Sequence, residues 1–223
     1  MESISTTTML KIIEKNSLFF ALYIISFFVV FFSELNKPML ETTLYFSAHR
    51  TALGDSFFSY WTLLGEAYPY FIVVLFFYFY KKDKQKTLKI AVTGLIILVV
   101  AFLLKEIFES PRPAAVLENL GLDCTFNYVA GIEMHKGATS FPSGHTASAF
   151  ALWGLLAFQF SRFRIIQFGL FLTAFLVGLS RVYLAQHFPQ DTLFGSAIGI
   201  SIALWVEYYF SKKNTSTQQE PPQ

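Results

Sequence analysis

Cysteine and charge are both scarce in this sequence of 223 residues. Its single cysteine, Cys124, has no partner, so a disulfide within the chain is excluded and the redox state of the compartment stays undetermined. Charged residues make up 14% of the chain, well under the roughly 25% of an average soluble domain. The sequence also has no internal repeat. The shortage of charge argues against a soluble domain.

Apolar residues take the place of the missing charge. They account for 54% of the chain, which has 27 phenylalanines and a mean hydropathy of +0.48. A helix crosses the ~30 Å hydrocarbon core of a bilayer with roughly 20 apolar residues. Six runs approach this length, at about 18–35, 67–80, 88–108, 141–160, 165–186 and 190–210. We therefore predict an all-α, polytopic membrane protein, a bundle of six transmembrane helices.

The segments outside these runs complete the predicted layout. The second run is short unless it begins further back, near Phe57, and the stretch 37–65 before it alternates apolar and polar residues, which predicts one or two short interfacial helices. The first run is long and lacks a small-residue cleavage pattern, so we expect an uncleaved anchor. Residues 1–17 are expected to be a cytoplasmic N-terminus, 18–210 the membrane domain, and 211–223 a disordered cytoplasmic tail.

The basic residues predict how the chain is oriented. One set of connecting segments (the N-terminus, 81–89, 161–164 and the C-terminal tail) carries eleven lysines and arginines, and the opposite set carries six. By the positive-inside rule, the richer set lies in the cytoplasm. Both termini are then inside, and the other cations lie on the outer face: Lys37, Arg50, Lys105, Arg112, Lys136 and Arg181.

Three of these outer cations, Lys105, Arg112 and Arg181, lie at or beside the ends of apolar helices. A cation in such a place is costly unless something requires it. For any one of them, snorkelling to the lipid headgroups is a sufficient explanation. Together, however, they fall at the same membrane surface as two histidines and a Pro-Ser-Gly turn, which favours a common role.

The sequence Pro142-Ser143-Gly144-His145 stands where the fourth apolar run begins. Pro142 suits the first turn of a helix. After it, Gly144 allows a ligand to approach free backbone N–H groups, and the Ser143 hydroxyl adds a donor. This pattern predicts an anion-binding helix N-terminus. Pro-Ser-Gly is also ordinary turn chemistry between two helices, so the tripeptide by itself leaves both interpretations open.

A histidine and a carboxylate meet between the fifth and sixth runs. Pro189 indicates that the fifth helix ends at His187 and that Asp191 lies in the first turn of the sixth. Asp191 can then hydrogen-bond one imidazole nitrogen and leave the other as a nucleophile or base. The alternative for Asp191 is a carboxylate that interacts favourably with the helix dipole.

His145, His187 and Asp191 are also a known set of metal ligands. The three neighbouring cations would repel a divalent ion, and no further acidic cluster accompanies them, so we expect no metal. The same cations suit a phosphoryl group, because Arg binds its oxygens in bidentate fashion and Lys meets them as a point charge.

These motifs resemble the three-part signature of the type-2 phosphatidic acid phosphatase superfamily, which also includes the vanadium haloperoxidases. The matching residues follow in the family's order and spacing: Lys105 with Arg112-Pro113, then Pro142-Ser143-Gly144-His145, then Ser180-Arg181 with His187 and Asp191. The six-helix layout is similar to that of the family's integral-membrane lipid phosphatases. Residues 1–104 carry no part of the signature.

The resemblance implies a role for each matching residue. His187 would attack phosphorus to form a phosphohistidine, with Asp191 orienting its ring, and His145 would protonate the leaving oxygen and later activate water. The phosphoryl oxygens would be held by Lys105, Arg112, Ser143, the Gly144 backbone N–H and Arg181. No metal or other cofactor is expected, because the cations and helix N–H groups supply the charge stabilisation. His187 must then be neutral and His145 protonated, which predicts a bell-shaped pH dependence of kcat/KM.

The expected activity is removal of phosphate from a lipid phosphate or pyrophosphate whose tails stay in the bilayer. Candidates are undecaprenyl pyrophosphate, phosphatidylglycerol phosphate, phosphatidate, diacylglycerol pyrophosphate and lipid A. If the chain is bacterial, it is an inner-membrane protein with its site facing the periplasm. The expected partners are this lipid and the bilayer, and no nucleic acid.

Three other functions are compatible with parts of the pattern. A lipid phosphotransferase would use the same phosphohistidine, and only an acceptor assay separates it from a hydrolase. Six membrane spans argue against a haloperoxidase. The intact pair of histidines and Asp191 argue against a non-enzymatic lipid-binding or transport relative.

Two further features concern the surroundings of the site. The loop 118–139 and the stretch 37–65 are candidates for headgroup contacts, although a solvated loop is the plainer interpretation. Gly195 and Gly199 form a small-xxx-small pattern on the sixth run, which predicts close helix packing within one chain.

Overall fold

Every regular element of the computed structural model, which describes residues 2–217, is a helix. The elements are α1 Glu2–Lys15, α2 Ser17–Glu34, α3 Glu41–Ala48, α4 Ala52–Trp61, η1 Thr62–Gly65, α5 Tyr68–Leu75, η2 Phe76–Tyr80, α6 Lys84–Phe108, α7 Pro113–Asn119, η3 Asp123–Thr125, α8 Gly144–Gln159, α9 Arg164–Tyr183 and α10 Pro189–Thr217. Of these, η1 and η3 are 3-10 helices and η2 is a π-helical turn. The predicted all-helical class is confirmed for the described residues.

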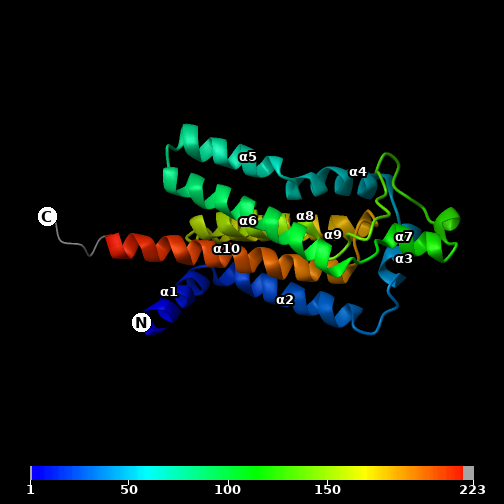
Figure 1. The fold of residues 1–223 in the computed structure, drawn as a ribbon, viewed down its shortest axis with the longest axis horizontal. Helices are drawn as coiled ribbons and strands as arrows, with labels where there is room; N and C mark the ends of the chain where they lie inside the picture. Colours follow the sequence, from blue (N-terminus) through cyan, green and yellow to red (C-terminus); the bar gives the residue numbers. More distant parts are fainter. Residues whose placement is uncertain (1, 218–223) are drawn as a thin grey trace.

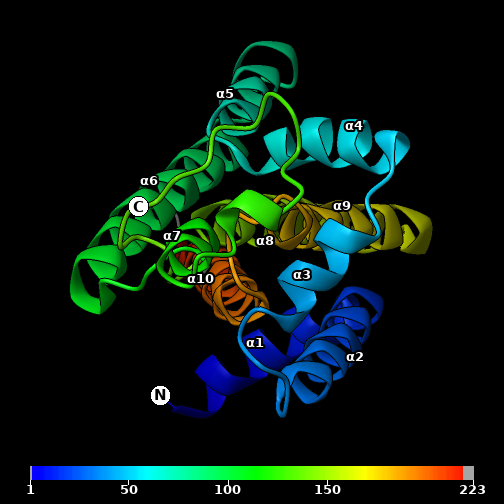
Figure 2. The same cartoon turned by 90° about the vertical axis from the view of Figure 1, so that its right-hand side faces the viewer.

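The long helices run side by side along one axis of the molecule (Figure 1). Viewed along that axis, α8 lies near the centre, with α5 and α6 to one side and α9 and α10 around it (Figure 2). It packs mainly against α10, α9 and α6. A helix enclosed by others needs small or apolar residues on every face, and α8 buries such residues on all sides: Ala147, Ala149, Phe150, Ala151, Leu152, Leu155, Leu156 and Ala157.

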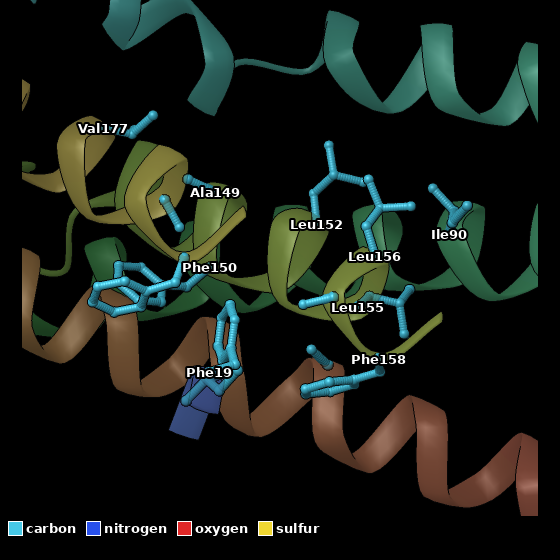
Figure 3. Packing of buried hydrophobic residues seen from close by; sticks show 14 of the residues in the cluster. Phe19, Ile90, Ala149, Phe150, Leu152, Leu155, Leu156, Phe158 and Val177 are labelled. Atoms are coloured by element: carbon cyan, nitrogen blue, oxygen red, sulfur yellow. The ribbon is translucent and has the colours of Figure 1, made fainter. Parts of the chain in front are cut away.

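One hydrophobic cluster joins the helices around α8 (Figure 3). Phe19 of α2 is fully buried, and its ring meets Phe158 of α8 and Phe171 of α9 edge-on, with centroids 6.1 and 5.8 Å apart. Ile90 of α6 and Val177 of α9 belong to the same cluster. Each edge-to-face pair adds about 0.5–1.5 kcal/mol beyond the burial itself. These contacts tie α2, which carries no motif, to the helices that carry the motifs.

Helices α8 and α10 approach closely at the two glycines of the small-xxx-small pattern. A Cβ on Gly195 would lie 2.6 Å from the carbonyl oxygen of Ser143, and one on Gly199 would overlap the carbonyl oxygen of Ala147. Neither position has room for a side chain. The predicted close packing within one chain is confirmed, and it holds the start of α10 against the start of α8.

The number of membrane crossings differs from the predicted six. Four helical segments are long and apolar enough to span a bilayer: Ser17–Glu34, Lys84–Asn119, Arg164–Tyr183 and Pro189–Lys212. A fifth is reached if Ala52–Gly65 and Tyr68–Tyr80, which meet at 58°, form one broken span. Helix α8 has 16 residues, because Pro142 and Ser143 precede it and it ends at Gln159. The membrane-spanning character is supported, and the count of six is not confirmed.

The stretch 37–65 contains two short helices, α3 and α4, of which α4 is also the first half of the bent pair. Their location in the membrane interface stays a prediction. Helix α4 continues through η1 to a break at Glu66 and Ala67, after which α5 begins. The second apolar run therefore does extend back past Phe57, but as a bent pair of helices. The break is important for the site described below.

Helix α9 ends at Tyr183, four residues before the predicted end at His187. The chain turns sharply here: Ala185 has a φ of +54°, and the N–H groups of Gln186 and His187 both donate to the carbonyl oxygen of Arg181. His187 thus lies in a loop. Asp191 is in the first turn of α10, as predicted.

The terminal segments are more helical than the sequence suggested. Helix α1 covers most of the predicted N-terminal segment 1–17, and α10 continues to Thr217, whereas disorder was expected from Ser211 onward. Residues 218–223 of the predicted tail lie outside the described residues. The α5–α6 connection and the last turns of α10 lie at one end of the bundle, and α3 and α7 lie at the other (Figure 1). The two sets of connecting segments that differ in charge are therefore at opposite ends.

Candidate active site

The eight predicted site residues all belong to the end of the bundle where α7 lies (right in Figure 1). Lys105 is in the last turn of α6 and Arg181 in the last turn of α9. Arg112 is the N-cap of α7, and His187 lies in the loop between α9 and α10. The remaining four residues, Ser143, Gly144, His145 and Asp191, stand at the starts of α8 and α10.

A hydrogen-bonded group of Ser140, Asp191 and His187 forms the deepest part of the site. The Ser140 hydroxyl donates to Asp191 Oδ2 over 2.6 Å, and the Phe188 backbone N–H donates to the same oxygen over 2.9 Å. His187 Nδ1 lies 3.5 Å both from Asp191 Oδ2 and from Ser140 Oγ. The three side chains are almost completely buried. The sequence left open which ring nitrogen Asp191 would face. In the structure it is Nδ1, and Ser140 holds the carboxylate in place.

The surroundings of His187 favour a neutral ring. Burial lowers the pKa of His187 well below its usual range, and the positive charges of Arg181 and Arg112 lower it further. His145 and Lys105 act in the same direction. Within residues 2–217 the side-chain contacts of His187 are both made by Nδ1, and none is made by Nε2, the nitrogen opposite Asp191. A neutral imidazole with one nitrogen held and the other unpaired is suited to act as a nucleophile.

The two arginines of the site are buried and held by neutral oxygens. Arg181 Nη1 donates to Thr62 Oγ1 over 2.8 Å, while its Nε is buried without a partner among the described residues. Arg112 donates through Nη1 to the Gln186 carbonyl oxygen at 3.0 Å, and through Nε and Nη2 to Thr139 at 3.3 Å. No carboxylate within the described residues forms an ion pair with either guanidinium. Two buried cations without a paired anion form a site for an anionic ligand.

The start of α8 differs in detail from the prediction. Pro142 and Ser143 precede the helix, and Ser143 is its N-cap. The Ser143 backbone N–H donates to the Asp191 carbonyl oxygen at 3.0 Å, and its hydroxyl is 2.8 Å from the Thr146 hydroxyl. Ser143 is therefore occupied in joining the starts of α8 and α10. Gly144 is the residue that leaves space for a ligand, since a Cβ there would lie 3.9 Å from Lys105 Nζ.

His145 forms a contact that the sequence motifs did not predict. Its Nε2 lies 2.6 Å from Glu66 Oε1, an oxygen from the break between η1 and α5. The two side chains are 25% and 43% exposed, so this pair lies at the rim of the site, unlike His187. His145 and His187 thus have different carboxylate partners. Among the described residues, no group of three or more His, Cys, Asp or Glu side chains is arranged to hold a metal ion.

An open groove of about 620 Å³ leads from the rim of the site into the apolar part of the bundle. Lys105, Gly144, His145 and Glu66 line its polar end. The rest of the lining comes mostly from apolar residues of α5 and α6: Tyr70, Phe71, Val74, Ala91, Leu95, Ile97, Leu98, Ala101 and Phe102. Such a groove fits a ligand with a negatively charged head and a long apolar tail.

A family model described as the PAP2 superfamily matches residues 86–215, more than half of the chain. The chain belongs to the PAP2 superfamily. The resemblance seen in the motifs is therefore confirmed.

Individual PAP2 relatives are similar over shorter or longer parts of the chain. The sequence is 26% identical over 136 residues to the undecaprenyl-diphosphatase BcrC of Bacillus subtilis (strain 168), a match that covers 61% of this chain and 64% of BcrC. The chain thus spans just under two thirds of the length of that relative. Its fold is similar to the crystal structure of Aquifex aeolicus LpxE, with a TM-score of 0.64, 32% identity, and coverage of 76% of this chain and 94% of LpxE.

A second solved structure supports the fold alone. The PAP2-type phosphatidylglycerolphosphate phosphatase of Bacillus subtilis has a TM-score of 0.64 and 21% identity, and the alignment covers 89% of this chain and 96% of that one. The helical arrangement around the site is therefore that of PAP2 membrane proteins.

Three contacts in this PAP2 site come from residues that sequence reasoning missed. Ser140 precedes the Pro-Ser-Gly motif, but a serine before a turn carries no specific signal. Thr62 and Glu66 lie before the region matched by the PAP2 model. Glu66 did carry a signal, because a lone carboxylate between two apolar segments is costly and thus marks a functional position.

Proposed function

We propose that this protein is a metal-independent membrane lipid phosphatase, which removes a phosphate from a lipid phosphate or pyrophosphate through a phosphohistidine on His187. The observation that carries the proposal is the state of the His187 ring, whose Nδ1 faces Asp191 while Nε2 is unpaired beside three cations. Those cations, Lys105, Arg112 and Arg181, are the groups that phosphoryl oxygens require.

In the proposed first step, Nε2 of His187 attacks phosphorus as the bond between phosphorus and the leaving oxygen breaks. His145 gives its proton to that oxygen, so the lipid leaves as an alcohol or a monophosphate. Water then attacks the phosphohistidine, His145 accepts a proton from it, and inorganic phosphate leaves with His187 restored. The three cations and the Gly144 backbone N–H offset the charge on the phosphoryl oxygens throughout.

The lipid substrate is inferred from the groove between α5 and α6. Its polar end contains Lys105 and His145, and its apolar walls include Phe71, Leu98 and Phe102, which are all more than 60% exposed. A lipid tail lying there would place its phosphate at the site. Undecaprenyl pyrophosphate is the leading candidate because BcrC is named for that substrate. Phosphatidylglycerol phosphate, phosphatidate and the phosphates of lipid A are the alternatives.

The proposed topology has six crossings, with both termini in the cytoplasm and the site on the outer face. The excess of basic residues at the end opposite the site supports this orientation. Helix α8 would be the crossing that falls short of the usual length. Because it is surrounded by other helices and not by lipid, its length need not match the hydrocarbon thickness.

The test is phosphate release by the purified protein in detergent, with a chelator present, from a panel of these lipids. Wild-type protein and the Arg162→Gln variant, which changes an exposed cation between α8 and α9, are expected to release phosphate. His187→Ala is expected to release none. Rapid quenching with a ³²P-labelled substrate should trap an acid-labile, base-stable phosphoprotein in the wild type and none in His187→Ala.

Each part of the proposal has an outcome that contradicts it. Loss of activity on chelation contradicts the metal-independent mechanism, and activity in His187→Ala contradicts the phosphohistidine. Transfer of the labelled phosphate to an added lipid or alcohol in preference to water would identify a phosphotransferase. No release from any lipid in the panel would contradict the enzymatic function.

A further inference from the structure

The break between α4 and α5 reaches the site at two places. Thr62, the first residue of η1, accepts a hydrogen bond from Arg181 Nη1 at 2.8 Å. Four residues later, Glu66 Oε1 lies 2.6 Å from His145 Nε2. Between them, Gly65 packs so closely that a Cβ would lie 2.7 Å from the His145 carbonyl oxygen. One short segment outside the PAP2 signature therefore contacts two members of the proposed catalytic set.

We propose that Glu66 is the positioning residue of His145, favouring the protonated form of its ring and fixing which nitrogen transfers the proton. This proposal rests on the acid and base role of His145 in the proposed function. Glu66 is an addition to the proposed set of functional residues, because it lies before residues 86–215, the region that the PAP2 model matches.

The surroundings of His145 disfavour a protonated ring, and Glu66 is the group that counteracts them. Lys105 faces it from α6, Arg181 from α9 and His187 from the loop before α10. Burial of the ring opposes a positive charge on the imidazole most strongly, and the cations Arg181 and Lys105 oppose it further, whereas a neutral His187 does not. Asp191 is bound on the far side of His187 by Ser140 and the Phe188 N–H. A general acid must carry its proton at the working pH, so an anion beside His145 meets a requirement of the reaction.

The geometry also assigns different tasks to the two ring nitrogens of His145. Nε2–H donates to Glu66, and this is the one side-chain contact of the His145 ring within residues 2–217. In the protonated ring, the Nδ1 proton moves to the leaving oxygen. The Nε2 proton stays on nitrogen and remains hydrogen-bonded to Glu66. The neutral ring that results has its lone pair on Nδ1, where it accepts a proton from the attacking water. Glu66 thus holds the neutral His145 ring in its Nε2–H tautomer in both steps.

The leaving group provides a readout that a purely structural role would not change. A general acid matters most for a poor leaving group such as an alkoxide, where it contributes about 10²–10⁴-fold. It matters much less for an aryl phosphate, whose leaving oxygen is stable without a proton. In Glu66→Gln, we expect kcat on an alkyl lipid phosphate to fall at least about tenfold more than kcat on an aryl phosphate. The alkaline limb of kcat/KM should move to lower pH.

Two variants serve as comparisons. Glu66→Asp keeps a carboxylate and should recover part of the alkaline limb and of the alkyl phosphate activity. Glu14→Gln removes an exposed carboxylate of α1, at the end of the bundle away from the site, and should behave as wild type. An equal fall on both substrates with an unmoved alkaline limb would show that Glu66 only supports the fold. A rise in activity in Glu66→Gln would show that the carboxylate blocks the site.

A measurement that needs no activity separates this proposal from the proposed function. ¹⁵N-histidine NMR of the protein in detergent follows the protonation of the four histidines directly, with His145→Asn used for assignment. His145 should lose its proton at lower pH in Glu66→Gln than in wild type, with Nε2–H as the neutral tautomer in wild type. If this shift occurs in a protein that hydrolyses no lipid, the pairing stands and the phosphatase function fails. If His145 titrates identically in both proteins, the proposal is wrong whatever the activity.

Discussion

The Ser140 hydroxyl offers the sharpest test of how the site is built. Ser140 is fully buried, and its hydroxyl donates to Asp191 Oδ2 over 2.6 Å. Ser140→Ala removes that bond without adding bulk. The carboxylate then keeps the Phe188 N–H at 2.9 Å and the His187 ring at 3.5 Å, so it is free to rotate away from Nδ1.

The expected loss follows from the strength of this one contact. A hydrogen bond to a charged group contributes about 1.5–3 kcal/mol. Each 1.36 kcal/mol of activation free energy changes a rate about tenfold. If the hydrogen bond holds the His187 ring for attack, its loss therefore lowers kcat/KM about 10- to 150-fold. Asp191→Asn removes the charge as well and should lower kcat/KM further. In the double variant, kcat/KM should fall by less than the product of the two single losses, because both substitutions act through the same His187 ring.

The assay is phosphate release measured together with thermal unfolding in detergent. Ser196→Ala is the control: its hydroxyl is also buried and donates to the Leu193 carbonyl oxygen at 2.7 Å, and its other partner is Tyr23 of α2, outside the catalytic set. Both variants should lose similar stability, and only Ser140→Ala should lose activity. A Ser140→Ala protein with kcat/KM within twofold of wild type, or a Ser196→Ala protein that loses as much, would refute this account of the site.

Other predictions concern titration, stability and orientation. The pKa of His187 is lowered, so its ring is neutral at pH 7 and becomes protonated only well below the usual 6.5. The acid limb of kcat/KM should therefore lie below that value. A limb at or above 6.5 would contradict the burial argument. Lys89 pairs with Glu207 at 2.9 Å near the basic end of the bundle, and the two side chains are 8% and 14% exposed. Lys89→Met leaves the carboxylate buried without its partner, so it should destabilise the protein by about 3 kcal/mol in detergent unfolding. Adding Glu207→Gln should restore part of the lost stability. Cys124, the only cysteine, is exposed at the site end, so a membrane-impermeant maleimide should label it in intact cells, and labelling only after lysis would reverse the proposed orientation.

Hydropathy and motif spacing were sufficient to predict most of the bundle. The runs that became α2, α6, α9 and α10 are long and continuously apolar, and such runs have one stable form in a bilayer. Their ends were less predictable. Pro189 is the visible helix breaker and predicts that α9 ends at His187. The chain already turns at Ala185, and nothing in the sequence signals a positive φ at an alanine.

The length of α8 escaped prediction for a related reason. Pro142 and Ser143 are compatible with the first turn of a helix, but Ser143 bonds to Asp191 and becomes the cap. That contact depends on the close approach of α8 to α10 at Gly195 and Gly199, 50 or so residues further along the chain. The small-xxx-small pattern predicted close packing of α10 but not the partner helix.

The sequence by itself determined that the chain is a helical membrane protein. It also identified the candidate cations, histidines and Asp191, because charged groups at the ends of apolar helices are too costly to be placed there without a use. The tertiary structure alone decided what each of them contacts. Ser140 on Asp191, Thr62 on Arg181 and Glu66 on His145 join residues 51 to 119 positions apart. A hydrogen bond requires atoms within about 3 Å, and that proximity arises only when helices distant in the sequence pack together.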